Sequence, residues 1–278
     1  MLGQAAKLSY YFVLAVFPLL ILVVALLAYV RPGNVLLESL LADWRHVLPH
    51  DAYTLIVDTL TEIRKNTGSG KLSIGLLGTL WAASNGVSAV MDGLNKAYEV
   101  REGRPWWKAQ LVAIALTIAG TVFVLTALAL VLGGEHIAYA IARYARLGKQ
   151  FEAAWAIAQW PLVLLFVLIA VALLYRFAPD LHGLEWSHIV PGAVVSVTLW
   201  LIVSSAFRVY LRYFNHYGTT YGSLGAMIIL MLWFYLTGAA ILVGGEVNSE
   251  IENAAARRGA PDARLPGQKG PGEPARRA

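Results

Sequence analysis

Two arginines near the end of a long apolar run are spaced to bind an anion. Arg208 and Arg212 lie four positions apart, so on a helix they share one face. Two guanidinium groups on one face can hold a phosphate or a carboxylate through paired hydrogen bonds, and ionisable groups in a membrane segment are functional candidates. Both side chains could instead extend along the membrane surface with their charges in water. The pattern therefore indicates either an anion site or a pair of interfacial anchors.

A second set of polar residues falls on one side of the segment 72–92. Asn85, Ser88, Asp92 and Asn95 follow one another at intervals of three and four, which places them on neighbouring turns of one helix face. A helix with this much polarity is stable in a membrane only if its polar side meets protein or water. The pattern predicts a stripe that lines a cavity. The alternative is helix–helix packing through small residues, with Asp92 at the water interface.

The last long apolar run has polar residues at both ends. Glu246 follows the uncharged segment 226–243 and is the carboxylate nearest to the apolar core. A gate, a proton site, a salt-bridge partner and a helix-end carboxylate are its open interpretations. The segment before the run combines hydroxyl groups, which can hydrogen-bond to neighbouring helices, with glycines, which permit close approach or an unwound turn. Its candidate pathway residues are Tyr217, Thr220, Tyr221 and Ser223.

The sequence lacks the residues and motifs that much of catalytic and metal chemistry uses. It contains no cysteine, and none of the patterns GxxxxGK(S/T), GxGxxG, GxSxG or HExxH occurs in it. His46 and His50 are four apart, but Pro49 interrupts the helix between them, so a solvated polar face explains them. We predict no catalytic residue, no metal site and no cofactor. Any transport must then be passive, or coupled to an ion gradient or a membrane potential.

Long uncharged runs indicate that the chain is an integral membrane protein. Of its 278 residues, 58% are hydrophobic and 14% are charged, whereas soluble domains carry about 25% charged residues. About twenty apolar residues in a helix cross the hydrocarbon core of a bilayer. We predict an all-α, polytopic membrane protein with six transmembrane helices. The predicted spans cover approximately residues 8–30, 72–92, 111–132, 155–175, 189–210 and 222–245.

Two further segments are amphipathic, and the carboxyl end has the composition of a disordered tail. Residues 36–65 and 137–147 place apolar residues at helical spacing among charged ones, which is typical of helices that lie on a membrane surface. Residues 254–278 are rich in Pro, Gly and Arg and have few large apolar side chains, so we predict a disordered basic tail. Residues 1–253 then form the membrane domain.

The distribution of basic residues predicts that both termini are cytoplasmic. An even number of spans places the two termini on one side of the membrane. The short loop 101–108 and the tail are dense in Arg and Lys, and cytoplasmic loops carry such an excess. In this topology Arg208 and Arg212 lie toward the external side, and Glu246 lies toward the cytoplasmic side.

Short motifs spread along the chain resemble those of a known family. They are Ser9-Tyr-Tyr, Phe17-Pro-Leu-Leu, Leu80-Trp-Ala-Ala-Ser-Asn, Leu94-Asn-Lys-Ala-Tyr98, Leu174-Tyr-Arg-Phe-Ala-Pro-Asp180, Pro191-Gly-Ala, Thr220-Tyr-Gly-Ser-Leu-Gly225 and Gly245-Glu-Val-Asn-Ser-Glu250. Together, from about residue 5 to 253, they resemble the YihY/virulence factor BrkB family. The resemblance implies a bacterial inner-membrane protein with six helices. Members of that family have been labelled ribonuclease BN, virulence factor, transporter and lipid exporter.

These features predict an inner-membrane transporter, exporter or flippase that is not driven by ATP. Its expected partners are membrane lipids and an amphiphilic or anionic solute or lipid as substrate, with no nucleic acid; nothing in the sequence indicates an oligomeric state. The alternative is a non-transporting scaffold for a partner in the cell envelope. A ribonuclease is disfavoured, because the sequence has no catalytic constellation and no soluble domain to hold RNA. The transporter interpretation predicts one cavity bordered by Asn85, Ser88, Asp92, Arg208 and residues 217–223.

Overall fold

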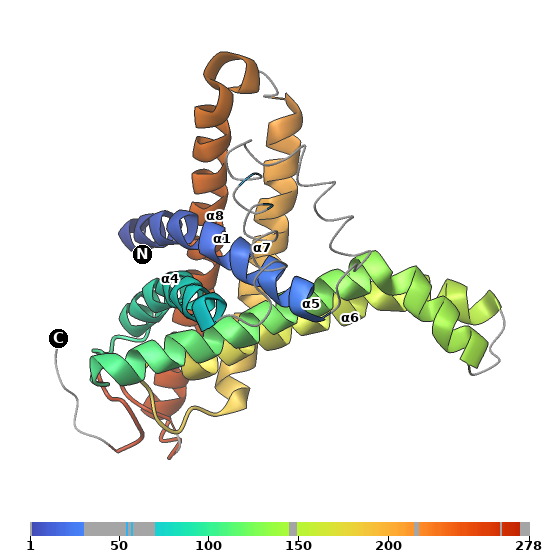
Figure 1. The fold of residues 1–278 in the computed structure, drawn as a ribbon. Helices are drawn as coiled ribbons and strands as arrows, with labels where there is room; N and C mark the ends of the chain where they lie inside the picture. Colours follow the sequence, from blue (N-terminus) through green and yellow to red (C-terminus); the bar gives the residue numbers. More distant parts are fainter. Residues whose placement is uncertain are drawn as a thin grey trace. The chain divides into compact units, whose positions relative to one another are not determined.

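The computed structural model describes most of the chain, and the residues that it describes are almost all helical. They are residues 2–30, 54, 57, 70–144, 149–213, 217–261 and 263–272. Six long helices lie in these ranges: α1 (Leu2–Val30), α4 (Gly70–Ala97), α5 (Trp106–Tyr144), α6 (Lys149–Phe177), α7 (Trp186–Tyr213) and α8 (Tyr217–Arg257) (Figure 1). No strand occurs in the described ranges. The prediction of an all-α chain is confirmed.

Five of these helices are long and apolar enough to cross a membrane. The crossing stretches are Leu2–Val23, Trp106–Ala127, Ala154–Phe177, Trp186–Arg212 and Met227–Arg257. A polytopic membrane protein is therefore confirmed. The helix outside this group is α4, whose glycines, serines and Asn85 make it the least apolar of the six. Six spans require that α4 cross as well, with its polar side away from lipid.

The two predicted amphipathic segments have different outcomes. Of the predicted surface helix 137–147, residues 137–144 are not a separate helix, since α5 continues without a break to Tyr144, and residues 145–147 lie outside the described residues. The pair Gly133 and Gly134 does not end the helix, because glycine lowers helix stability by only about 1 kcal/mol per residue. The predicted amphipathic helices at 36–65 lie outside the described residues, apart from Thr54 and Val57.

The chain divides into two compact units. Unit 1 comprises residues 1–16, 81–117 and 171–278, and unit 2 comprises residues 17–80 and 118–170. In unit 2, α5 and α6 contact each other through the rings of Phe123 and Phe166, whose centroids are 5.9 Å apart. Every candidate site residue belongs to unit 1.

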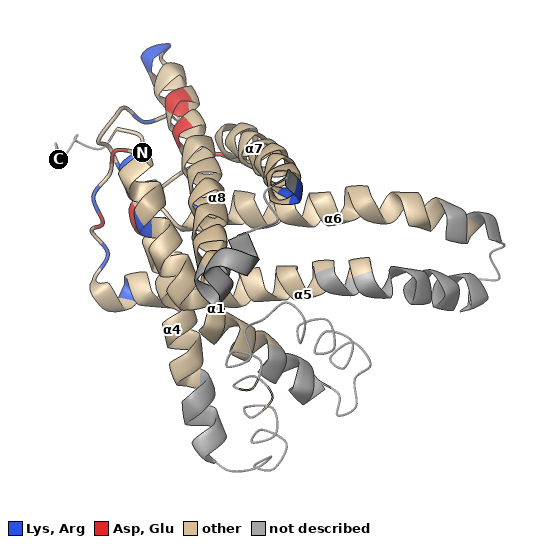
Figure 2. Ribbon diagram, turned by 90° about the horizontal axis from the view of Figure 1, so that it is seen from above, with Lys and Arg blue, Asp and Glu red and all other residues tan. Residues whose placement is uncertain are grey.

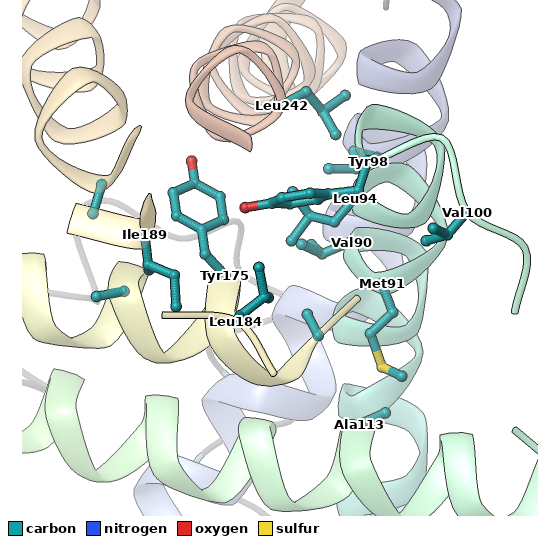
Figure 3. Close-up of a cluster of buried hydrophobic side chains, with 14 of the residues drawn as sticks. Val90, Met91, Leu94, Tyr98, Val100, Ala113, Tyr175, Leu184, Ile189 and Leu242 are labelled. Atoms are coloured by element: carbon teal, nitrogen blue, oxygen red, sulfur yellow. The ribbon is translucent and has the colours of Figure 1, made fainter. Parts of the chain in front are cut away.

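The core of unit 1 joins its helices around two tyrosines. Tyr98, just after α4, and Tyr175 on α6 approach each other beneath α8 (Figure 3). Both are fully buried, together with Leu8 of α1, Ile189 of α7 and Leu242 of α8. The Tyr175 hydroxyl donates a hydrogen bond of 2.6 Å to the carbonyl of Ile241, which satisfies its polar end inside the core.

Small residues let α7 and α8 cross at very short range. Gly192 and Ser196 on α7 face Gly244 and Asn248 on α8, and a Cβ added to Gly192 would collide with the Gly244 carbonyl oxygen. The Asn248 side chain accepts a hydrogen bond of 2.6 Å from the Gly192 backbone N–H. This spacing of small residues is the usual way in which membrane helices approach closely. This close contact fixes the positions of α7, which carries Arg208, and α8, which carries Glu246, relative to each other.

The described part of the carboxyl end, residues 254–261 and 263–272, differs from the predicted disordered tail. The helix α8 continues to Arg257, and residues 263–272 form a segment, here called the C-terminal strap, that packs against the rest of unit 1. Ala263 and Arg264 of the strap are buried. Composition alone predicts disorder because the tail has few large apolar residues. Its anchoring instead depends on individual charged side chains with fixed partners.

Candidate functional site

The ion pairs between described residues of unit 1 gather at one end of its helices. Lys7 near the start of α1 forms an ion pair of 2.7 Å with Asp92 near the end of α4. The backbone N–H of Gly103, before α5, donates to the Asp180 carboxylate, after α6, at 2.9 Å. We call this region, with the end of α8 and the strap, the polar end. Carboxylate residues mark α8 near the same end (Figure 2). The start of α1 thus meets the end of α4, and the loop before α5 meets the loop after α6.

The end of α4 is closed by a tight cap with an unusual residue in it. The N–H of Val100 donates to the Asn95 carbonyl at 2.8 Å, and the N–H of Glu99 donates to the Lys96 carbonyl at 3.1 Å. These two bonds form a Schellman motif, in which the left-handed position normally belongs to glycine. Here Glu99 occupies it, with a φ of 55°, and it is the one residue other than glycine with a positive φ in the described ranges.

Asn95 connects the two loops of the polar end. It is 3% exposed. Its Nδ2 donates to Glu102 Oε2 at 3.0 Å, and its Oδ1 accepts from the backbone N–H of Asp180 at 2.8 Å. Both ends of the amide are therefore used, so Asn95 fixes the loops between α4 and α5 and between α6 and α7. Asn95, which the sequence predicted as a pathway residue, therefore links the two loops structurally.

Asp180 is the centre of a network of ion pairs. Lys269 of the strap forms an ion pair with its carboxylate, and Arg104 Nε lies 3.7 Å from its Oδ1. Burial raises the pKa of this carboxyl, but hydrogen bonds from Lys269 and Gly103 outweigh that effect and hold the pKa of Asp180 below its usual range. Asp180 therefore carries a negative charge at neutral pH, and this charge secures the strap.

Arg264 holds the strap at its other end. The side chain is completely buried, and its Nε lies 2.9 Å from Oε2 of the equally buried Glu252 on α8. Its Nη1 donates to the carbonyls of Tyr98 and Gln268, each at 3.1 Å, and the guanidinium lies 5.2 Å from the centre of the Tyr98 ring. Burial lowers the pKa of Arg264, against the field of Glu252, yet an arginine stays protonated at neutral pH.

A cavity of about 740 Å³ opens at the polar end. Pockets for small molecules typically measure about 300–1,000 Å³. Its lining residues come from the end of α4, from the following loop and from the strap: Asp92, Asn95, Lys96, Glu99, Val100, Arg101, Glu102, Pro266 and Gly267. Two predicted pathway residues, Asp92 and Asn95, are among them.

The predicted stripe on α4 leads toward this cavity. Asn85 and Asp92 are both exposed, and Ser88 between them is half-buried. The Ser88 hydroxyl donates to the Ser84 carbonyl within the same helix at 3.1 Å. The stripe is therefore present on one face of α4, and its Asp92 end forms part of the cavity wall.

The paired arginines lie elsewhere. Arg208 and Arg212 are exposed in the last turns of α7, and neither lines the cavity beside Asp92. Contrary to the prediction from the sequence, the cavity at the polar end therefore does not unite these arginines with α4. Of Tyr217, Thr220, Tyr221 and Ser223 only the backbone is described, and it is helical from Tyr217 onward.

Glu246 is exposed on α8, next to the buried Gly245. The carboxylate of α8 that makes a buried ion pair is Glu252, which lies further along the helix. Sequence reasoning missed Glu252, Arg264, Asp180 and Lys269. Their partners are 12 and 89 residues away along the chain, so no local pattern reveals the pairs.

Comparison with known proteins agrees with the family resemblance. A family model described as virulence factor BrkB matches residues 1–266. A ribonuclease-like protein of Bacillus subtilis (strain 168), YfkH, is 36% identical over 247 residues, which cover 89% of this chain and 88% of that protein. A UPF0761 membrane protein of Xanthomonas oryzae pv. oryzae (strain PXO99A) is 29% identical over 94% of this chain, which spans 59% of that longer protein. No solved structure matches the chain.

The family match extends beyond the membrane helices. It reaches residue 266 and so includes Arg264, which anchors the strap to Glu252. The first part of the strap is thus included in the family's own sequence pattern. The motifs, the apolar helices and the family match lead to one conclusion: the chain belongs to the virulence factor BrkB family of membrane proteins.

Proposed function

We propose that this chain moves an amphiphilic or anionic solute or lipid across the bacterial inner membrane, without nucleotide hydrolysis. The observation that supports this most is the exposed polar face of α4. An amide that meets only lipid loses its hydrogen bonds at a cost of several kcal/mol. Asn85 is exposed in the middle of α4, and it would meet lipid there if α4 crosses the membrane with this face outward. Its face of the helix therefore needs water or a polar ligand beside it.

The stripe has the layout expected of one side of a pathway. It begins at Asn85, continues past Ser88, and reaches Asp92 at the wall of the cavity. The ion pair between Asp92 and Lys7 is partly open, with side chains 52% and 37% exposed. Exposed ion pairs are weak, at about 0–1 kcal/mol, so a charged ligand can compete for either partner at little cost.

The paired arginines suit the opposite end of such a pathway. Arg208 and Arg212 are exposed on α7, and in the predicted topology they face the external side. Two adjacent guanidinium groups there would attract the anionic part of an amphiphile as it leaves the membrane. We propose that the solute enters at the cavity and leaves beside these arginines, which is the direction of export.

Three carboxylates of the polar end are held in ion pairs, which favours transport over nucleic-acid cleavage. The Bacillus relative is named ribonuclease-like. In this chain Glu102 pairs with Arg104, Asp180 with Lys269, and Glu252 with Arg264. Carboxylates engaged in this way hold loops and the strap in place.

Transport by the purified protein in liposomes tests the proposal. A fluorescent phospholipid and a fluorescent organic anion serve as substrates, and we expect faster movement of at least one than in protein-free liposomes. Asn85→Leu should lower that rate about tenfold, since one hydrogen-bonding group of about 1–1.5 kcal/mol is lost from the path. The matched control is Val194→Leu, at an exposed apolar position of α7, which should transport normally.

Two results would count against transport. The first is a rate equal to that of protein-free liposomes for both substrates. The second is normal transport by Asn85→Leu, which would remove α4 from the path. Arg208→Ala combined with Arg212→Ala addresses the other end, where an unchanged rate for the organic anion would eliminate the proposed exit site.

A further inference from the structure

Three charges in the cavity have no ion-pair partner among the described residues. Asp92 is neutralised by Lys7, and Glu102 by Arg104. The remaining charges are the cations Lys96 and Arg101 and the anion Glu99. All three side chains are exposed. Glu99 acts over distance on the buried Arg264 but forms no ion pair with a described cation. The cavity thus offers two positive groups and one negative group to a ligand.

The backbone at Glu99 gives an independent reason to connect its carboxylate with binding. Its left-handed conformation is disfavoured for a residue with a Cβ, and glycine would make the same cap without that strain. Strained backbone of this kind is concentrated at ligand sites, where the surrounding structure holds it in place. Here the cap holds the carboxylate at the wall of the cavity, one helical turn after Lys96.

The residues that follow the cavity place it at the level of lipid headgroups. Trp106 and Trp107 begin α5 and are 74% and 48% exposed. The Lys108 ammonium lies 5.3 Å from the centre of the Trp107 ring. Exposed tryptophans beside basic residues mark the interface between the bilayer and water. Arg101, on the loop that leads to these tryptophans, therefore lies close to that interface.

We propose that the cavity binds a zwitterionic headgroup that carries an ammonium and a phosphate. The phosphate pairs with Lys96 and Arg101, and the ammonium pairs with Glu99. This rests on the proposed transport function and narrows its substrate to the phosphoethanolamine class. A headgroup with only negative charge would place that charge beside Glu99, which is unpaired among the described residues, without a cation of its own to offset the repulsion. An ammonium and a phosphate occur together both in the headgroup of a membrane lipid and in a free phosphoethanolamine.

Binding, measured apart from transport, tests the assignment. The full chain in nanodiscs is titrated with fluorescent phosphatidylethanolamine and with fluorescent phosphatidylglycerol, which lacks the ammonium. Water-soluble glycerophosphoethanolamine, followed by its phosphorus resonance, is the second arm. Glu99→Gly removes the carboxylate and keeps the cap, because glycine prefers this backbone. It should therefore fold normally, and a thermal unfolding curve checks this.

We expect each class of variant to leave its own signature. Glu99→Gly should weaken binding of phosphatidylethanolamine about tenfold or more, the typical effect of losing one charge-assisted contact, and should leave phosphatidylglycerol binding unchanged or tighter. Lys96→Gln combined with Arg101→Gln should weaken binding of both lipids. Arg258→Gln, which removes an exposed cation outside the cavity, should change neither.

The lipid and glycerophosphoethanolamine measurements also distinguish this binding proposal from the proposed transport function. Tight lipid binding with the expected variant pattern but without transport would support the site and contradict the transporter. Binding of glycerophosphoethanolamine with the same pattern would support the site and identify a free solute as its ligand. Wild-type protein that binds neither form, or a Glu99→Gly variant with unchanged preference between the two lipids, would overturn the assignment.

Discussion

Replacing Arg264 with methionine is expected to destabilise the polar end by about 3–5 kcal/mol. Arg264→Met leaves the buried carboxylate of Glu252 without its cation, and an uncompensated buried charge has a cost of this size. It also removes the donors to the carbonyls of Tyr98 and Gln268. The strap should then detach. Thermal unfolding in detergent measures the global loss, and limited proteolysis within residues 263–272 reports release of the strap.

A double substitution distinguishes the ion pair from simple loss of packing. Glu252→Gln combined with Arg264→Met leaves no buried charge, so it should cost less than Arg264→Met alone. Arg258→Met is the matched control, since Arg258 is exposed in the turn that follows α8. That change should stay within about 0.5 kcal/mol. If Arg264→Met were as stable and as protease-resistant as this control, the role of Arg264 in anchoring the strap would be refuted.

Replacing Gly192 with alanine is the second large expected effect, at roughly 2–4 kcal/mol. The new Cβ would meet the Gly244 carbonyl oxygen and the Asn248 side chain. Backbone cannot yield locally, so α7 and α8 must move apart. Overpacking of this kind costs about 1–3 kcal/mol. Loss of the hydrogen bond between Gly192 and Asn248 adds about 1 kcal/mol. A lower melting temperature in detergent is the readout.

The chain provides a matched control for the glycine substitution. Gly120 lies inside α5, and a Cβ added there would have nothing within 4 Å, so Gly120→Ala should be neutral or slightly stabilising. Equal melting temperatures for Gly192→Ala and Gly120→Ala would show that α7 and α8 do not cross at such short range.

The membrane character and the polar face of α4 could be predicted from the sequence because both are local properties. Uncharged runs near twenty residues predict spans wherever they occur, and five described helices meet that test. The spacing of Asn85, Ser88 and Asp92 predicts one helix face, and the structure places these residues along α4. The same polar residues also predicted that α4 is less apolar than the other helices.

The polar end could not be predicted, because its contacts join distant parts of the chain. Arg264 in a Pro- and Gly-rich tail has the composition of disorder, and only its contact with Glu252 makes it structural. Asp180 and Lys269 are 89 residues apart. The cap at Glu99 was equally hidden, since glycine is the residue that normally signals such a cap. The spacing of Arg208 and Arg212 likewise gave no sign that neither side chain lines the cavity beside Asp92.

Thiol labelling of the α4 stripe tests the central claim most directly, because the natural chain has no cysteine. In proteoliposomes, Asn85→Cys should react with a charged, membrane-impermeant thiol reagent, since only a hydrated thiol ionises and reacts readily. The attached group should then stop transport. Val194→Cys, on an exposed apolar face of α7, should neither react nor lose activity. If Asn85→Cys were as unreactive as Val194→Cys, or were fully labelled and still transported at the unlabelled rate, α4 would not line the path.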